Sequence, residues 1–393
     1  MRAENQRPKR RPNVKILHTA DWHVGKTIQG QSRAHEHEAV LAELAAVAAR
    51  EKVDLVLVAG DLFDTSAPTP EAERIVYRGL LALSELAPVV AIPGNHDSDR
   101  RLSALAPLFD LARVTIRAGV SRDPVEVQTA GGTVRVACVP WLSQRYIVKA
   151  AHLMDEEAAD SRARYEERMA LVVESLTKSF QRDAVNIVMA HLPMVGAEIG
   201  GGERTAQTIF DYWVNSTLFP SDAHYVALGH LHKMQSVIGP CPIHYPGSPL
   251  QLDFGETDLN RYALLVEAAA GVPATTEPVK LQAGRRLRTL RGKLADLEPL
   301  AGTTGDDYLR VIVNEKARVG LGEEVRELFP NAVKVIIDYE ATGGDGRKTQ
   351  LDRSSLTPHE LFLLYLGEKE VEDDGLVALF DELHEEAHAT STA

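Results

Sequence analysis

The chain has 393 residues, of which 44% are hydrophobic and 25% charged, and its formal net charge is −13. This length exceeds the size at which one hydrophobic core keeps growing, so two or three folded units are expected. The composition is typical of a globular protein, and no apolar stretch is long enough to span a bilayer. We therefore expect no membrane insertion.

The N-terminal segment and the cysteines indicate the compartment. Residues 1–13 are basic and contain proline, but they lack the apolar segment of a secretory signal. We expect this segment to be disordered and the protein to be cytoplasmic. Cys138 and Cys241 are the only cysteines in the sequence, so neither a disulfide framework nor a zinc knuckle is supported.

The negative charge is concentrated near the C-terminus. Residues 367–389 hold nine acids and one lysine, which leaves a net charge of −5 for the rest of the chain. Proteins that bind nucleic acids usually have an excess of basic residues. Because the acids are so localised, the overall charge does not exclude a nucleic-acid partner.

From Val14 to about Tyr262, short β-rich runs alternate with helical stretches, a pattern that predicts an α/β domain at 14–270. Strands are expected at 14–17, 53–59, 88–92, 185–190 and 224–228. Helices are expected at 34–51, 69–86, 99–111 and 155–181.

A smaller α+β module is expected at 280–341, with strands at 308–314 and 332–339 and a helix near 321–329. It contains a basic tract at 285–293. This tract fits either phosphate binding or a domain-joining helix that packs on acids.

The last part of the chain has a different character. Residues 342–350 have the glycine-rich, polar composition of a linker. Two amphipathic helices are expected at 351–389, the first starting at Thr357. They are too short to form a core of their own, so they dock either on the same chain or on a partner.

Five polar motifs each follow one of the five predicted strands of the α/β domain. They are Asp21-Trp22-His23, Gly60-Asp61, Gly94-Asn95-His96-Asp97, His191 and Gly229-His230-Leu231-His232. Because the carboxyl ends of strands in such a sheet meet at one edge, we expect these side chains to lie close together.

The residue types in these motifs suit divalent cations such as Mn²⁺, Zn²⁺ or Fe²⁺. One carboxylate, for which Asp61 is the candidate, can bridge two ions about 3.5–4 Å apart that clamp a phosphoryl group. An Asp-x-His or a His-x-His alone is better explained as a hydrogen-bonded polar pair at a strand end, whereas Gly-Asn-His-Asp is more specific. The five in this order predict a two-metal phosphoesterase.

The set D-x-H, G-D-x-x-D, G-N-H-D, H and G-H-x-H resembles the calcineurin-like metallophosphoesterase superfamily. Longer stretches, among them HTADWHVGKTIQG, VDLVLVAGDLFDTSAPTPEA and YPGSPLQLDFGE, resemble its bacterial DNA nucleases over nearly the whole chain. The resemblance implies a four-layer αββα sandwich with a small α+β cap domain at 280–341 and C-terminal helices.

The resemblance also implies the ligands of two metal ions, most often Mn²⁺, with Mg²⁺, Zn²⁺ or Fe²⁺ as alternatives. One ion would be held by Asp21, His23, Asp61 and His232, and the other by Asp61, Asn95, His191 and His230. A metal-activated water would be the nucleophile.

His96 is implied to be the catalytic residue that contacts the scissile phosphate, and Asp97 to orient His96 or hold its loop. At position 64 the archaeal and eukaryotic counterparts carry a histidine, whereas this chain resembles the bacterial branch in having Asp64. Asp64 is therefore not expected to assist His96 as that histidine would. We expect Asp64 to lie next to the metal ligands and to support them.

The nearest cations to the motifs are candidate DNA contacts, with plain solvation as the alternative. They are Lys26, Arg33, Arg100, Arg101 and Lys233. The resemblance further implies a homodimer through the helices near 69–86 and 99–111, and an ATPase as the partner of the C-terminal helices.

The activity implied is hydrolysis of DNA phosphodiesters in DNA repair, recombination and replication. It would be a 3'–5' exonuclease on duplex ends and an endonuclease on single strands or hairpins. Two alternatives are a generic metallophosphatase acting on small or protein phosphoesters and a non-catalytic scaffold that binds DNA ends.

Overall fold

The computed structural model describes residues 13–142, 158–201, 203, 212–256 and 260–338, and five helical positions further on, Phe362, Leu366, Leu376, Leu379 and Phe380. The chain divides into two compact units, one formed by residues 1–203 and 208–339 and the other by residues 204–207 and 340–393. Among the described residues, no helix is long and apolar enough to cross a membrane.

The first sheet has six strands in the described part of the chain, in the order β14-β13-β1-β4-β5-β6. They are β1 (Val14–Thr19), β4 (Leu55–Ala59), β5 (Val89–Ile92), β6 (Val114–Ile116), β13 (Arg261–Ala269) and β14 (Val272–Leu281). Strands β1, β4, β5 and β6 are parallel, whereas β13 is antiparallel to both β1 and β14.

The second sheet also has six described strands, in the order β11-β12-β10-β9-β8-β7. They are β7 (Val125–Thr129), β8 (Gly132–Val139), β9 (Val185–His191), β10 (Tyr225–Gly229), β11 (Gln235–Val237) and β12 (Ile243–Tyr245). Strands β8, β9, β10 and β12 are parallel. The central parallel strands of both sheets are nearly continuous apolar runs because both of their faces are covered.

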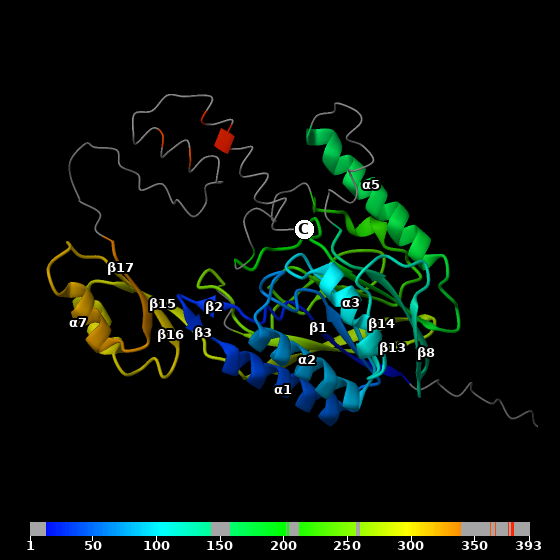
Figure 1. Ribbon diagram of the computed structural model, residues 1–393, viewed down its shortest axis with the longest axis horizontal. Helices are drawn as coiled ribbons and strands as arrows, with labels where there is room; N and C mark the ends of the chain where they lie inside the picture. The colour runs from blue at the N-terminus through cyan, green and yellow to red at the C-terminus, as the bar shows by residue number, and fades with distance from the viewer. Residues whose placement is uncertain are drawn as a thin grey trace, which may run out of the picture. The chain divides into compact units, whose positions relative to one another are not determined.

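The two sheets pack face to face through a core that includes Ile16 and Leu57 from the first sheet and Ile187 and Met189 from the second. Helices α1 (Ala34–Glu51), α2 (Pro70–Leu86) and α3 (Asp99–Asp110) cover the outer face of the first sheet, and α5 (Ala158–Thr177) covers that of the second. Figure 1 shows α1 and α2 on one side of the sheets and α5 on the other. The predicted four-layer αββα sandwich is confirmed.

Helices α2 and α3 begin at residues whose side chains cap them. The side chain of Thr69 accepts a hydrogen bond from the amide of Ala72 at 3.2 Å, and Pro70 occupies the first turn of α2. Ser98 caps α3 in the same way. Helix α1 has the predicted bounds. The start of the helix predicted at 155 lies outside the described residues.

A third sheet, β15-β16-β17, is parallel and has its own small core, which includes Leu309, Val311, Val325 and Phe329. Its elements are β15 (Leu287–Gly292), α6 (Leu294–Leu297), a 3₁₀ turn (Glu298–Leu300), β16 (Tyr308–Val313), α7 (Leu321–Leu328) and β17 (Ala332–Ile337). We call this part the three-stranded module.

The basic tract at 285–293 is a strand, so the alternative of a domain-joining helix is wrong. Leu287 and Leu290 are buried while the arginines between and beside them face outwards, and β15 pairs in parallel with β16. The acids expected beside the tract are present, since Arg288 pairs with Asp307 and Arg291 with Asp338, each at 3.1 Å.

Smaller features complete the description. A two-stranded hairpin is formed by β2 (Thr27–Ile28) and β3 (Gln31–Ser32), and a 3₁₀ turn spans Ser216–Leu218. In the second unit, the rings of Phe362 and Phe380 are stacked with centroids 4.1 Å apart. The predicted linker at 342–350 and the helix start at Thr357 lie outside the described residues.

Candidate two-metal site

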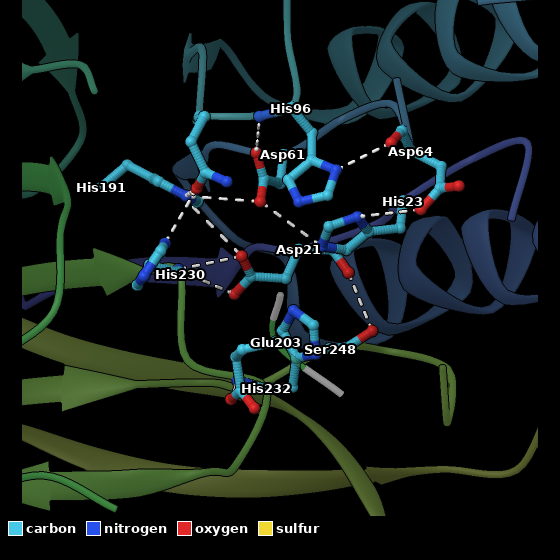
Figure 2. A network of polar contacts seen from close by, with 12 residues as sticks. Asp21, His23, Asp61, Asp64, His96, His191, Glu203, His230, His232 and Ser248 are labelled. Atoms are coloured by element: carbon cyan, nitrogen blue, oxygen red, sulfur yellow. Dashed lines mark hydrogen bonds and ion pairs between the residues drawn. The ribbon is translucent and has the colours of Figure 1, made fainter. Parts of the chain in front are cut away.

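The predicted site residues converge at the carboxyl ends of the parallel strands, as expected. Asp21 and His23 follow β1, Asp61 follows β4, Asn95 and His96 follow β5, His191 ends β9, and His230 and His232 follow β10. Figure 2 labels all of these residues but Asn95 and shows their side chains pointing toward one another. Asp21, His23, Asp61, His191, His230 and His232 are each at most 4% exposed.

These donors fall into groups of the size of a metal site. One ligand atom each of Asp21, His23 and His232 lies within 4.8 Å of the others, and the same holds for Asp21, Asp61 and His191. Two ring nitrogens, His23 Nε2 and His230 Nε2, are buried without a hydrogen-bond partner. Because an unpaired buried polar atom is costly, this donor set fits divalent metal ions well.

Asp61 belongs to the second group and also reaches His23 of the first. Its Oδ2 is 3.4 Å from His23 Nε2 and 3.4 Å from His191 Nε2, while its Oδ1 accepts the amide hydrogen bond of His96 at 2.8 Å. One oxygen is thus fixed by the main chain and the other faces both groups of histidines. This position suits a bridging carboxylate.

Asn95 occupies a similar place between two histidines. Its Oδ1 is 3.0 Å from His191 Nε2 and 2.8 Å from His230 Nδ1. On the far side of the ring, His191 Nδ1 is 2.8 Å from the carbonyl oxygen of Ala59. Because a carbonyl only accepts, Nδ1 carries a proton, and in the neutral ring Nε2 presents its lone pair to the site.

Several site residues have a strained backbone. The φ angles of Asp21, His23, Asp61 and His230 are 54°, 45°, 51° and 106°, in the left-handed region that side chains other than glycine rarely adopt. Hydrogen bonds hold the strained loops, among them that from the Asp21 amide to the carbonyl of Gly60 at 2.9 Å. Strain of this kind is concentrated at functional sites.

Two motif glycines are required by close packing. A Cβ atom at Gly60 would collide with the ring of His191, and one at Gly94 would collide with the side chain and amide nitrogen of Asp61. The glycines therefore let neighbouring ligand loops approach one another.

Burial and mutual charge set the protonation of the cluster. Burial raises the pKa of Asp21 to about 7 and lowers that of His23 to about 4. Burial also disfavours the ionised form of Asp61, but His191 and His96 outweigh it and hold the pKa well below the usual range. For His191 and His232 burial is outweighed by carboxylates, chiefly Asp61 and Glu256 respectively, and each pKa rises to about 9.

His96 stands beside the cluster. Its ring lies 4.6 Å from that of His23, edge to face, and its Nδ1 is 2.7 Å from the main-chain carbonyl oxygen of Asp64. The Asp64 side chain serves other groups, with Oδ1 3.4 Å from Lys26 Nζ and 3.6 Å from His23 Nδ1. Asp64 therefore supports His96 through its main chain.

Asp97 holds loops rather than His96. Its carboxylate accepts hydrogen bonds from the amides of Leu62, Phe63 and Gly94 at 2.9–3.1 Å. These bonds tie the loop that carries Asp61 to the loop that carries Asn95. Of the two roles that the sequence allowed for Asp97, the geometry supports the second.

Three residues around the site were missed by the sequence analysis. Glu256 Oε1 lies 3.2 Å from His232 Nδ1, and Glu203 Oε1 accepts the amide of His232 at 2.9 Å. Trp141 stacks on the ring of His230 with centroids 5.2 Å apart. Trp141 follows β8, so the same strand-end argument would have found it, had β8 been recognised.

The candidate DNA contacts have different surroundings. Arg33 is 1% exposed, and its guanidinium contacts Glu36 and the carbonyl of Gln251, which is at odds with the predicted DNA contact. Lys26 pairs with Asp64, Lys233 with Glu198 and Arg101 with Glu73. Arg100 is exposed at the start of α3.

The fold and the donor cluster define a class of proteins. The model of the calcineurin-like phosphoesterase family matches residues 14–234. The chain belongs to this family, and the resemblance seen in its motifs is confirmed.

Curated relatives place the chain more narrowly. The SbcD component of the nuclease SbcCD from Bacillus subtilis is 36% identical over 280 residues, which cover 70% of this chain and 71% of that protein. The SbcD protein of Rhodobacter capsulatus is 34% identical over 66% of this chain and 67% of its own length. The SbcD protein of Escherichia coli K12 is 28% identical over 72% of each chain. Within the phosphoesterases, the chain is a member of the SbcD group.

Proposed function

We propose that this chain is a metal-dependent DNA nuclease that acts with an SbcC-type ATPase in the processing of DNA ends, in repair, recombination and replication. The observation that carries the proposal is the position of Asp61 Oδ2, 3.4 Å from a histidine of each donor group, in a chain 36% identical to a component of a nuclease. A carboxylate between two ions is the usual centre of a two-metal phosphodiesterase site.

The proposed ligand sets are those that the motifs implied. Asp21, His23, Asp61 and His232 would hold one ion, and Asp61, Asn95, His191 and His230 the other. Mn²⁺ is the proposed metal, because carboxylate, amide and imidazole donors without thiolate suit it. When bound, the two ions would supply Lewis acidity and lower the pKa of an attacking water.

His96 is proposed to act on the phosphodiester itself. Its Nδ1 is engaged by the Asp64 carbonyl at 2.7 Å, which fixes the ring and leaves Nε2 to approach a substrate oxygen. There it would stabilise the developing charge or donate a proton to the departing sugar oxygen. Asp97 would act indirectly, because its hydrogen bonds hold the loop of Asp61 against the loop of Asn95.

The remaining regions are proposed to serve binding. The three-stranded module, within 280–341, would cap the DNA, and residues 342–350 would link it to ATPase-binding helices at 351–389. Leu108 and Leu111, which are 66% and 87% exposed at the end of α3, support a homodimer through α2 and α3. The complex would work on nucleoid DNA in the cytoplasm.

The decisive test is a cleavage assay on end-labelled duplex and hairpin DNA with Mn²⁺, Mg²⁺ or a chelator, with and without the ATPase and ATP. We expect Mn²⁺-dependent 3'–5' shortening of the duplex and opening of the hairpin. Hydrolysis of small phosphoesters without cleavage of DNA would support the metallophosphatase alternative. Binding of DNA ends without any hydrolysis would support the scaffold alternative.

The partner surfaces have their own tests. Deleting residues 351–393 should abolish co-purification with the ATPase and spare Mn²⁺-dependent nuclease activity. The double change Leu108→Glu and Leu111→Glu should convert a dimer into a monomer in sedimentation experiments. Retained co-purification or a retained dimer would contradict the corresponding assignment.

A further inference from the structure

Gln251 is a buried amide that joins the phosphoesterase core to the three-stranded module. Its Oε1 accepts the amide hydrogen bond of Leu287, the first residue of β15, at 2.7 Å, and its Nε2 is 3.1 Å from the carbonyl oxygen of the same residue. The same Nε2 donates to the main-chain carbonyl of Glu256 at 2.8 Å. One side chain thus ties the start of the module to Glu256.

Glu256 in turn holds His232. Its Oε1 lies 3.2 Å from His232 Nδ1, while its Oε2 accepts the amide of Leu252 at 3.1 Å and pairs with Arg261 at 2.9 Å. Glu256 is 2% exposed. A buried carboxylate fixed on several sides gives a ligating histidine little freedom to rotate, which is how residues around a metal site tune its affinity.

A second connection leaves the site at His23. The hairpin β2–β3 follows His23 closely in the chain, and its Ile28 packs in a small apolar cluster with Leu287 and Tyr308 of the module. Both connections from the module therefore reach residues of the same donor group, Asp21, His23 and His232.

The other donor group is held by the phosphoesterase core. His191 contacts the carbonyl of Ala59, Asn95 lies between His191 and His230, and Trp141 stacks on His230. Among the contacts given by the described residues, none of these involves the three-stranded module. Among the described residues, the contacts of the module therefore lead to the group of Asp21, His23 and His232 and not to the other group.

We propose that Gln251 is a positioning residue: through Glu256 it sets the ring of His232, so that the seating of the module controls metal affinity at the group of Asp21, His23 and His232. Affinity at the other group is independent of it. This inference rests on the proposed two-metal function.

Asn186 offers a matched control for Gln251. It is 2% exposed, compared with 4% for Gln251, and its amide makes the same two-way contact, accepting from the nitrogen of Gln181 at 3.2 Å and donating to the oxygen at 3.0 Å. Gln251→Leu and Asn186→Leu each remove a buried amide that makes this two-way contact with one main-chain residue. Only the first removes a bond that leads to His232.

The experiment measures Mn²⁺ binding to the full-length chain by equilibrium dialysis and electron paramagnetic resonance. We expect Gln251→Leu to lower the affinity for one of the two Mn²⁺ ions about tenfold. This is the lower end of the loss expected when a residue that supports a metal ligand is changed. Asn186→Leu should leave both ions at wild-type affinity. Gln251→Met, an uncharged side chain of similar length without the amide, should weaken binding of the same ion, which covers the case in which the leucine variant unfolds.

Single-site backgrounds identify the ion that is affected. In a His191→Ala background, Gln251→Leu should lower the affinity for the remaining Mn²⁺ ion about tenfold. In a His23→Ala background, the same change should leave the affinity for the remaining ion unaltered. Wild-type binding of both ions in Gln251→Leu and Gln251→Met, or equal losses at both ions, would overturn the inference. A wild-type chain that binds no Mn²⁺ would instead contradict the proposed function.

Discussion

The ring of His96 is oriented by the main chain of Asp64, because His96 Nδ1 lies 2.7 Å from the Asp64 carbonyl oxygen. A carbonyl oxygen only accepts hydrogen bonds, so it fixes the proton on Nδ1 and the orientation of the ring. Any residue at position 64 that keeps the same backbone conformation supplies this contact.

The first prediction follows from this arrangement. His96→Ala should lower DNA cleavage about 10²–10⁴-fold, as expected for removal of a group that transfers a proton, and leave Mn²⁺ binding intact. Cleavage is measured on end-labelled duplex DNA and the metal content by elemental analysis. Asp64→Asn keeps the carbonyl and should lose far less activity. Equal losses in the two variants would show that the Asp64 side chain acts on catalysis.

The second prediction concerns Asp61. Its Oδ2 faces both His23 and His191, so Asp61→Ala removes a donor from both groups at once. We expect the affinity for both ions to fall at least about 10-fold and cleavage to be abolished. Calorimetric titration with Mn²⁺ measures the affinity. His96→Ala, which binds metal but does not cleave, is the matched comparison, and an Asp61→Ala protein that still binds two ions tightly would refute the bridging role.

The donor cluster could be predicted from the sequence because each ligand directly follows a strand, and strand ends in a parallel sheet share one edge. The bounds of helix α1 could also be predicted, because the apolar residues that recur at helical spacing lie within the helix itself. In contrast, β13 and β14 were missed, because their hairpin is partly exposed and its apolar pattern is broken by Glu267 and Glu277.

The residues that support the ligands could not be predicted in the same way. Glu256 reaches His232 across 24 positions of sequence and Arg33 reaches Gln251 across 218, so neither contact leaves a periodic pattern. Arg33 was assigned to DNA from its nearness to the first motif. Its burial depends on a tertiary contact that no local rule reports.

The third prediction uses the close packing at Gly94. A methyl group there would collide with the Asp61 carboxylate and would lie 2.5 Å from the Asp61 main-chain nitrogen, so one of these groups would have to shift. Gly94→Ala should destabilise the fold by about 1–3 kcal/mol and weaken Mn²⁺ binding. Chemical denaturation and calorimetric titration measure the two effects. Gly119→Ala is the control, because a Cβ atom there meets nothing within 4 Å. Equal behaviour of the two variants would contradict the packing argument.

The fourth prediction is that Mn²⁺ binds more tightly as the pH rises from about 6.5 to 9. The pKa values of His191 and His232 are about 9 in the metal-free protein, where burial is outweighed by neighbouring carboxylates. Both rings therefore carry two protons at neutral pH, and a metal ion must displace one of them. Titrations in buffers of different ionisation enthalpy should show protons released on binding.

The same pKa values predict how the stability of the metal-free protein changes with pH. A histidine whose pKa is raised from 6.5 to about 9 on folding adds stability that is complete below pH 6.5 and is lost as the pH rises toward 9. The melting temperature of the metal-free protein should therefore fall across this range. That of the protein with saturating Mn²⁺ should not, since the ligating rings are then neutral throughout. Parallel pH profiles with and without Mn²⁺ would contradict the proposed exchange of protons for metal.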